Sequence, residues 1–238
     1  MFVKVCGVTT EEDALLAVAM GADAVGFNFV AASPRRTLPG TVRDIVRRLP
    51  GGVFRVGVFQ NEHPKRVVEI MDEAQLNTAQ LHGNESPEEC TWVSERVQRL
   101  FKAFRPGDPG LENLAAYRAA AILVDGAEPG SGKVFDWTRL DGVSRGLPLI
   151  VAGGLTPANV GDAIRTLRPF GVDVASGVEA SPGVKDPTKV REFVANARAA
   201  ALETGLEARP ATGTASGTAT GTNGEPAGRS RPYDWSDE

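Results

Sequence analysis

Eight short apolar runs, each followed by a segment whose apolar residues recur at helical spacing, fill most of the first two hundred residues. Strands joined by helices at roughly 25 residues a unit are typical of parallel sheets with helical crossovers. Eight such units in one domain predict an α/β fold, the (β/α)8 or TIM barrel. The expected strands are Phe2–Cys6, Ala24–Phe29, Phe54–Phe59, Thr78–Leu81, Arg99–Phe104, Ala121–Asp125, Leu149–Ala152 and Val172–Ala175.

An open, doubly wound sheet is the alternative architecture. Such a sheet usually has fewer strands and carries its main glycine fingerprint in the first strand-to-helix turn. Here the most prominent glycine turns follow the seventh and eighth runs. The pattern therefore favours the barrel.

Local sequence signals predict where the first helix begins and which of its residues are buried. Thr9 or Thr10 can cap it, and Glu12 would complete a capping box if Thr9 is the cap. The residues expected on its buried side are Ala14, Leu15, Val18 and Ala19.

The composition changes from about Glu203. Residues 210–228 are nearly all Ala, Thr, Gly, Ser, Asn and Pro. Such a segment cannot bury enough apolar surface to offset its ordering entropy. We therefore divide the chain into a barrel, residues 1–202, and a tail, residues 203–238, that is predicted to be disordered.

Charge and cysteine content narrow the class of protein. A formal net charge of −4 in 238 residues gives no support to nucleic-acid binding. No apolar run approaches the roughly 18 residues of a membrane-spanning helix, and the first residues lack the regions of a signal peptide. Two cysteines and two histidines, with no cluster at ligand spacing, argue against a disulfide framework or a metal site. We expect a cytoplasmic protein without membrane association, metal or cofactor.

Two glycine-bearing turns predict an anion site. Gly153-Gly154 follows the seventh run, and Ser176-Gly177 follows the eighth. Glycine turns at helix N-termini present backbone N–H groups to phosphate, and the loops after strands seven and eight of a barrel often form such a site. The glycines could instead serve only to close tight turns. Two such turns in consecutive units favour a phosphorylated small-molecule ligand.

Two strand-end residues are candidates for acid–base chemistry. Cys6 is either a small apolar filler or a thiolate base or nucleophile, which would need a lowered pKa. Asp125 either caps a turn or is an acid whose pKa is raised in a partly dry site. Because they come from the first and sixth strands, they would face a ligand from well-separated points. A base and an acid so placed suit a proton-shuttling isomerisation.

Other polar residues follow the expected strands. Arg35 and Arg36 lie in the loop after the second strand, where they are either solvated charge or a clamp for a carboxylate. His82 is either a third acid–base group or a structural imidazole. Gln80 and Lys102 also fall near predicted strand ends.

Several motifs together resemble one family, the phosphoribosylanthranilate isomerases of tryptophan biosynthesis. The resemblance runs in order over about residues 1–200. Its motifs are Lys4-Val5-Cys6-Gly7-Val8-Thr9, Gly21–Phe27, Arg55–Phe59, Gln80-Leu81-His82-Gly83, Gly130–Trp137, Gly153–Val160 and Ser176-Gly177-Val178-Glu179.

The resemblance implies an enzyme, an aldose–ketose isomerase. Its reaction would be the Amadori rearrangement of N-(5′-phosphoribosyl)anthranilate to 1-(2-carboxyphenylamino)-1-deoxyribulose 5-phosphate, with no cofactor. It implies Cys6 as general base and Asp125 as general acid. Arg35 aligns best with the family's substrate-binding arginine, although Arg36 stays open. The phosphate would lie against Gly153, Gly154, Ser176 and Gly177.

Two other functions stay open at this point. Isomerase barrels of histidine biosynthesis generally have an aspartate where this chain has Cys6, which disfavours that activity. A non-catalytic barrel that binds a phosphorylated ligand would not need both Cys6 and Asp125. Either a monomer or a homodimer is compatible with the sequence.

Overall fold

The computed structural model of the 238-residue chain describes residues 1–126 and 146–206. The motif Gly130–Trp137 and residues 207–238 of the predicted tail lie outside the described residues.

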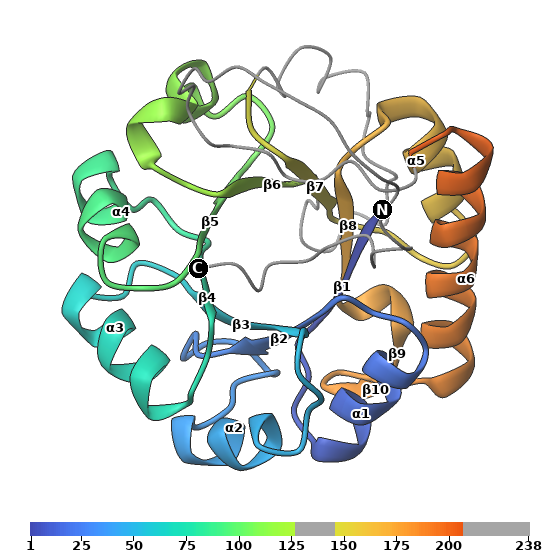
Figure 1. Cartoon of the computed structure of the whole chain (residues 1–238), viewed down its shortest axis with the longest axis horizontal. Coiled ribbons are helices and arrows are strands. Elements are labelled where there is room, and N and C mark those ends of the chain that lie inside the picture. The colour runs from blue at the N-terminus through green and yellow to red at the C-terminus, as the bar shows by residue number, and fades with distance from the viewer. Residues whose placement is uncertain (127–145, 207–238) are drawn as a thin grey trace, which may run out of the picture.

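Eight parallel strands close into a barrel (Figure 1). Each strand pairs with the next, and β1 pairs with β8 through contacts that include Lys4 opposite Asp173. This closing pair confirms the predicted (β/α)8 barrel and rules out the open sheet. The strands are β1 (Phe2–Cys6), β2 (Ala24–Asn28), β3 (Phe54–Phe59), β4 (Thr78–Leu81), β5 (Leu100–Phe104), β6 (Ala121–Asp125), β7 (Leu149–Ala152) and β8 (Gly171–Val174).

Helices surround the barrel and cover the outer faces of its strands (Figure 1). Proline occupies the first turn of four of them, where its missing N–H costs nothing. The α-helices in the described residues are α1 (Glu11–Ala19), α2 (Pro39–Val46), α3 (Pro64–Glu73), α4 (Pro87–Ser94), α5 (Val160–Leu167) and α6 (Pro187–Glu203). After β5 the helical spacing gives a 3-10 segment, η1 (Pro109–Tyr117), which is kinked at Asn113.

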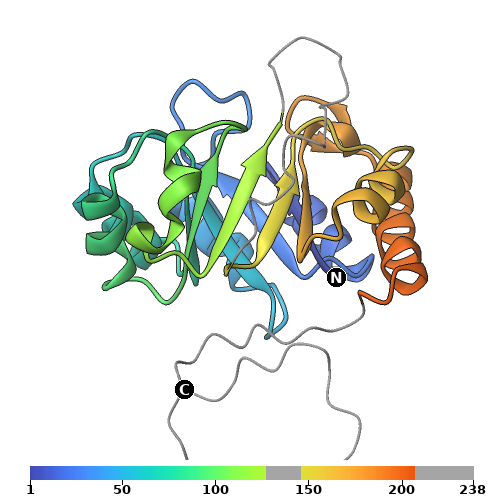
Figure 2. The same cartoon turned by 90° about the horizontal axis from the view of Figure 1, so that it is seen from above.

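The barrel interior has an aromatic end and a polar end. Phe2 packs edge-on against Phe54, with ring centroids 5.2 Å apart, and stacks with Phe170 at 5.6 Å. These rings fill the end of the barrel at which the strands begin. Because the strand arrows all run toward the other end (Figure 2), the loops that follow the strands gather there. Only that end is available for a polar site.

Of the two caps that the sequence allowed for α1, the structure has Thr10. Thr10 is the cap and accepts a hydrogen bond from the Asp13 N–H at 3.2 Å, whereas the Thr9 hydroxyl donates to the Gly183 carbonyl at 2.6 Å. The capping box with Glu12 is therefore absent. The buried side differs from the predicted one, because the Asp13 carboxylate turns inward to accept from the Lys185 N–H. The buried residues of α1 are Asp13, Ala14 and Ala17.

The connection after β8 is more elaborate than the predicted turn. A short 3-10 turn, η3 (Ser176–Val178), leads into two antiparallel strands, β9 (Glu179–Ser181) and β10 (Val184–Lys185). This hairpin lies beside α1 and precedes α6 (Figure 1).

The described part of the barrel continues four residues beyond the predicted boundary at 202. Glu203 ends α6, and the Leu206 N–H donates to the Ala201 carbonyl at 2.9 Å. The Leu206 side chain packs against the core. Residues 203–206 therefore belong to the barrel.

Candidate active site

One cavity, of about 200 Å³, lies at the polar end of the barrel. All seven residues predicted for the site line it, although they come from five separate parts of the chain. They are Cys6, Arg35, Asp125, Gly153, Gly154, Ser176 and Gly177. Four polar side chains that the sequence did not assign to the site share its wall: Asn28, Gln80, His82 and Asp173.

Cys6 ends β1 with its side chain turned inward, opposite Gly26 on β2. It is 8% exposed. Burial raises the pKa of the thiol, and the opposing charges of Lys4 and Lys185 do not cancel this effect. A role as base requires the thiolate, which burial disfavours in the free protein. The thiol is the main form near pH 7, and its thiolate is a strong base when it forms.

Asp125 ends β6 and contacts His82 at the cavity wall. The His82 Nε2 atom lies 3.3 Å from Asp125 Oδ2, and both side chains are about a third exposed. The His82 Nδ1 atom lies 2.9 Å from the amide nitrogen of Gln80. Gln80 and Asp125 thus contact the two ring nitrogens of His82, one on each side of the ring. His82 therefore orients the carboxylate of Asp125.

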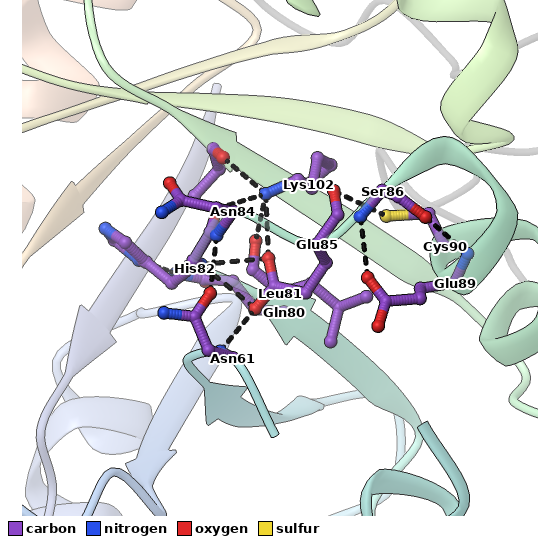
Figure 3. Close-up of polar contacts among 12 residues, drawn as sticks. Asn61, Gln80, Leu81, His82, Asn84, Glu85, Ser86, Glu89, Cys90 and Lys102 are labelled. Carbon is purple, nitrogen blue, oxygen red and sulfur yellow. Dashed lines mark hydrogen bonds and ion pairs between the residues drawn. The ribbon is translucent and has the colours of Figure 1, made fainter. Parts of the chain in front are cut away.

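The loop between β4 and α4 is braced by a buried ion pair (Figure 3). Lys102 Nζ lies 2.9 Å from Glu85 Oε2 and 2.7 Å from the Gly83 carbonyl. Glu85 in turn accepts from the N–H groups of Gly83 and Asn61 at 2.9 and 2.8 Å. This bracing fixes the backbone on both sides of His82.

Lys102 itself does not line the cavity. It is 2% exposed, and its ammonium lies under the loop after β4 rather than in the barrel interior (Figure 3). The position of Lys102 near a strand end in the sequence did not show whether its side chain points into the barrel or away from it. Its contribution is structural support for the loop that carries His82.

Arg35 reaches the cavity across Gly7. A Cβ atom at Gly7 would overlap the Arg35 side chain, and the φ of Gly7 is +71°, so two separate demands require glycine here. The Arg35 guanidinium forms a bidentate ion pair with Glu179 on β9. Arg36, the alternative, is exposed and does not line the cavity.

Lys185 ties the ends of two strands together beneath this pair. Its side chain is fully buried, and Nζ donates to the carbonyls of Cys6 and Ala175 at 2.6 and 3.1 Å. It also lies 3.1 Å from Glu179 Oε1. The hairpin β9–β10 thus fixes the end of β1 and the position of Arg35. Sequence reasoning missed Lys185 because an isolated lysine after a loop gives no sign of burial.

The glycine turn after β7 has an unusual backbone conformation. Gly153 and Gly154 have φ of +89° and +66°, a conformation that few other residues adopt. Asn159 holds this turn by donating to the Gly154 carbonyl at 2.9 Å. A Cβ atom at Gly177 would overlap the carbonyl of Leu155, so the two turns pack directly against each other.

The amino-acid sequence matches the family model of N-(5′-phosphoribosyl)anthranilate (PRA) isomerase over residues 3–196. The chain belongs to the phosphoribosylanthranilate isomerase family. The resemblance seen in the sequence motifs is thereby confirmed. The chain is an isomerase of tryptophan biosynthesis.

Individual relatives agree with the family model. The N-(5′-phosphoribosyl)anthranilate isomerase of Trichlorobacter lovleyi is 46% identical over 203 residues, which cover 83% of this chain and 98% of the relative. That of Thermotoga maritima is 45% identical over 200 residues, covering 82% and 98%. The crystal structure of the Thermus thermophilus isomerase superposes with a TM-score of 0.77 at 41% identity, covering 84% of this chain and 99% of that one.

Within residues 1–126 and 146–206, no group of three or more His, Cys, Asp or Glu side chains is arranged to hold a metal ion. No helix in the described part of the chain is long and apolar enough to cross a membrane.

Proposed function

We propose that the chain converts N-(5′-phosphoribosyl)anthranilate to 1-(2-carboxyphenylamino)-1-deoxyribulose 5-phosphate, with Cys6 as general base and Asp125 as general acid. The observation that carries this proposal is that the acid, the base, the arginine and both phosphate turns line one cavity. A solved phosphoribosylanthranilate isomerase is in complex with reduced 1-(O-carboxyphenylamino)-1-deoxyribulose 5-phosphate, which supports the same product here.

Binding begins at the two ends of the substrate. The backbone N–H groups of the turns at Gly153-Gly154 and Ser176-Gly177 hold the phosphate. Arg35 receives the anthranilate carboxylate, because its guanidinium is at the cavity wall and Arg36 is not. Anchors at both ends orient the ribose between Cys6 and Asp125 without taking part in the reacting bonds.

The chemistry is three proton transfers on the ribose. Asp125 protonates the ring oxygen as the bond from that oxygen to C1′ breaks, and the nitrogen lone pair forms a C1′=N iminium. The Cys6 thiolate then removes the proton on C2′, and the electron pair moves through C1′ to the nitrogen to give an enolamine. Transfer of a proton from the 2′ hydroxyl to C1′ completes the ketose. Every atom and electron of the substrate is kept in the product, and one proton passed through solvent from the Cys6 thiol to the Asp125 carboxylate restores the base and the acid.

The test is a fluorescence assay that follows the loss of phosphoribosylanthranilate by the full-length chain. Cys6→Ser and Asp125→Asn are each expected to lower kcat by about a hundredfold or more, the usual contribution of one acid–base group. Cys90→Ser, in α4, and Asp162→Asn, exposed on α5, are the matched controls and should keep normal rates. A near-normal rate in Cys6→Ser or Asp125→Asn would contradict the role given to that residue.

Two further measurements on the same purified protein distinguish this proposal from its alternatives. Turnover of the aminoaldose substrate of histidine biosynthesis at an equal rate would point to a barrel with two activities. Tight phosphate binding without turnover of either substrate would point to a binding protein.

Two further properties follow as proposals. Cys6 must stay reduced to act as a base, which supports a cytoplasmic location. A solved relative from Thermotoga maritima is described as dimeric in its native form. For this chain, sedimentation at assay concentrations would distinguish a homodimer from a monomer.

A further inference from the structure

A fully buried lysine lies directly beside the proposed base. Lys4 and Cys6 are two residues apart on β1, so both side chains point into the barrel. Lys4 is 0% exposed. Its Nζ lies 3.0 Å from each carboxylate oxygen of Asp173 on β8, which fixes the ammonium in one place.

Gly26 makes room for the ammonium and the sulfur together. A Cβ atom at this position would lie 2.7 Å from Cys6 Sγ and 3.1 Å from Lys4 Nζ. Both atoms therefore occupy the space that a side chain on β2 would otherwise take. The Lys4 ammonium and the Cys6 sulfur are therefore neighbours in the barrel interior.

We propose that Lys4 is a positioning residue for the general base, holding a cation against Cys6 that stabilises its thiolate. The inference rests on the proposed function, which makes Cys6 the base. It explains why an ion pair is buried in the barrel interior, where apolar residues of similar volume would often be as stable or more so. Thiolates form where a cation is adjacent, and Lys4 supplies one that solvent does not screen.

Lys4 differs from the other charged groups near Cys6. Lys185 bonds the Cys6 carbonyl and Glu179, rather than the sulfur. Burial raises the pKa of Cys6, and Lys4 is the strongest of the groups that oppose this rise. The charged and titratable groups facing Cys6 are Lys4 on its own strand, Asp173 from β8, Lys185 from β10, Arg35 from the loop after β2, and, across the cavity, His82 and Asp125.

The test measures the thiolate directly, without using catalysis. Cys90→Ala leaves Cys6 as the one cysteine of the chain, and the rate of its alkylation by iodoacetamide is followed against pH. In this reaction the thiolate displaces iodide, and its proton goes to the buffer. Lys4→Met should lower the rate at pH 8 about tenfold or more, which corresponds to a rise of one unit in the pKa. Lys4→Arg keeps a cation at this position, so its alkylation rate should lie between those of Lys4→Met and the parent.

Two further variants keep the result interpretable. Lys65→Met removes a lysine that is exposed on α3 and should leave the alkylation profile unchanged. Lys4→Met with Asp173→Asn leaves no unpaired buried carboxylate, so it reports on the thiol even if the single variant folds poorly. Its rate should also fall. Circular dichroism checks that each variant is folded.

The outcomes separate this inference from the proposed function. An alkylation profile for folded Lys4→Met that overlays the parent overturns the role of Lys4, whatever its activity. A normal turnover rate in Cys6→Ser overturns the role of Cys6 as base but leaves the alkylation result standing. If both assignments hold, the acidic limb of kcat/KM moves to higher pH in Lys4→Met together with the alkylation curve.

Discussion

Arg35 and Glu179, which are 144 residues apart, meet in a bidentate ion pair at the cavity wall. Arg35 Nε lies 2.7 Å from Oε1, and Nη2 lies 2.7 Å from Oε2. Hydrogen bonding to Glu179 raises the pKa of Arg35. Burial would raise the pKa of Glu179, but its bonds to Arg35 and Lys185 hold that pKa below its ordinary value. The guanidinium is thus oriented before a ligand arrives.

Replacing Arg35 by lysine tests its assignment to the substrate carboxylate. A single ammonium cannot bond Glu179 and a second carboxylate in the same planar geometry. Loss of one charged hydrogen bond to substrate should raise KM about tenfold to a hundredfold with a smaller change in kcat. Arg36→Lys is the matched control in the same loop and should keep the parent KM. Equal KM values for the two variants would contradict the assignment.

Gly177→Ala tests the phosphate turns. Its methyl group would overlap the Leu155 carbonyl, so the two turns must separate. We expect KM to rise about tenfold or more, and competitive inhibition by inorganic phosphate to weaken in parallel, because the N–H groups no longer converge. Gly161→Ala, within α5, meets only the Arg165 side chain and should gain up to about 1 kcal/mol of helix stability with no change in KM. A parent-like KM in Gly177→Ala would place phosphate elsewhere.

Lys102→Met tests the ion pair under the loop that carries His82. Removing the lysine leaves the Glu85 carboxylate, 6% exposed, without its cation. Urea unfolding at pH 7 should show a loss of about 3–5 kcal/mol. Adding Glu85→Gln should recover part of that loss because the buried charge is gone. Lys65→Met, on the exposed side of α3, should change stability by less than about 0.5 kcal/mol. A similarly small effect in Lys102→Met would mean that the pair contributes little.

Acid should weaken the same pair. Burial alone would raise the pKa of Glu85, but Lys102 and the Asn61 N–H outweigh it and lower that pKa below 4.5. A lowered folded-state pKa means that the stabilisation is complete above the unfolded value and is lost as pH falls through the folded one. The stability difference between the parent and Glu85→Gln should therefore be constant above about pH 5 and shrink below about pH 4.5. If the stability difference instead grows as the pH falls, the pKa of Glu85 is raised in the folded protein and not lowered.

Two truncated chains test where the barrel ends. A chain ending at Leu206 should keep the parent melting temperature and rate, since the sequence predicts that the remaining tail does not pack. A chain ending at Leu202 also loses the bond of Glu203 to Arg165 and the contact of Leu206 with the core. It should lose about 1–2 kcal/mol, the value of a partly buried leucine and its neighbours. A large loss of stability in the chain that ends at Leu206 would show that residues 207–238 stabilise the barrel.

The sequence by itself determined the barrel and, to within one residue, the ends of its strands. Strand-to-helix alternation, proline at first turns and glycine in the turns after β7 and β8 are local signals. They can be recognised without knowing which segments meet. Cys6 and Asp125 could be predicted as site residues for the same reason, because the end of a parallel strand is a defined place in a barrel.

Only the tertiary structure decided which charges meet and which way the strand residues face. Strands of a parallel barrel are buried on both sides, so their sequences lack the alternation that would reveal an inward side. Lys4 and Lys102 look alike in the sequence, yet one lies beside Cys6 and the other lies under the loop after β4. The pairing of Lys4 with Asp173 joins residues 169 positions apart. It exists because β1 closes the barrel against β8, and no local signal carries that register.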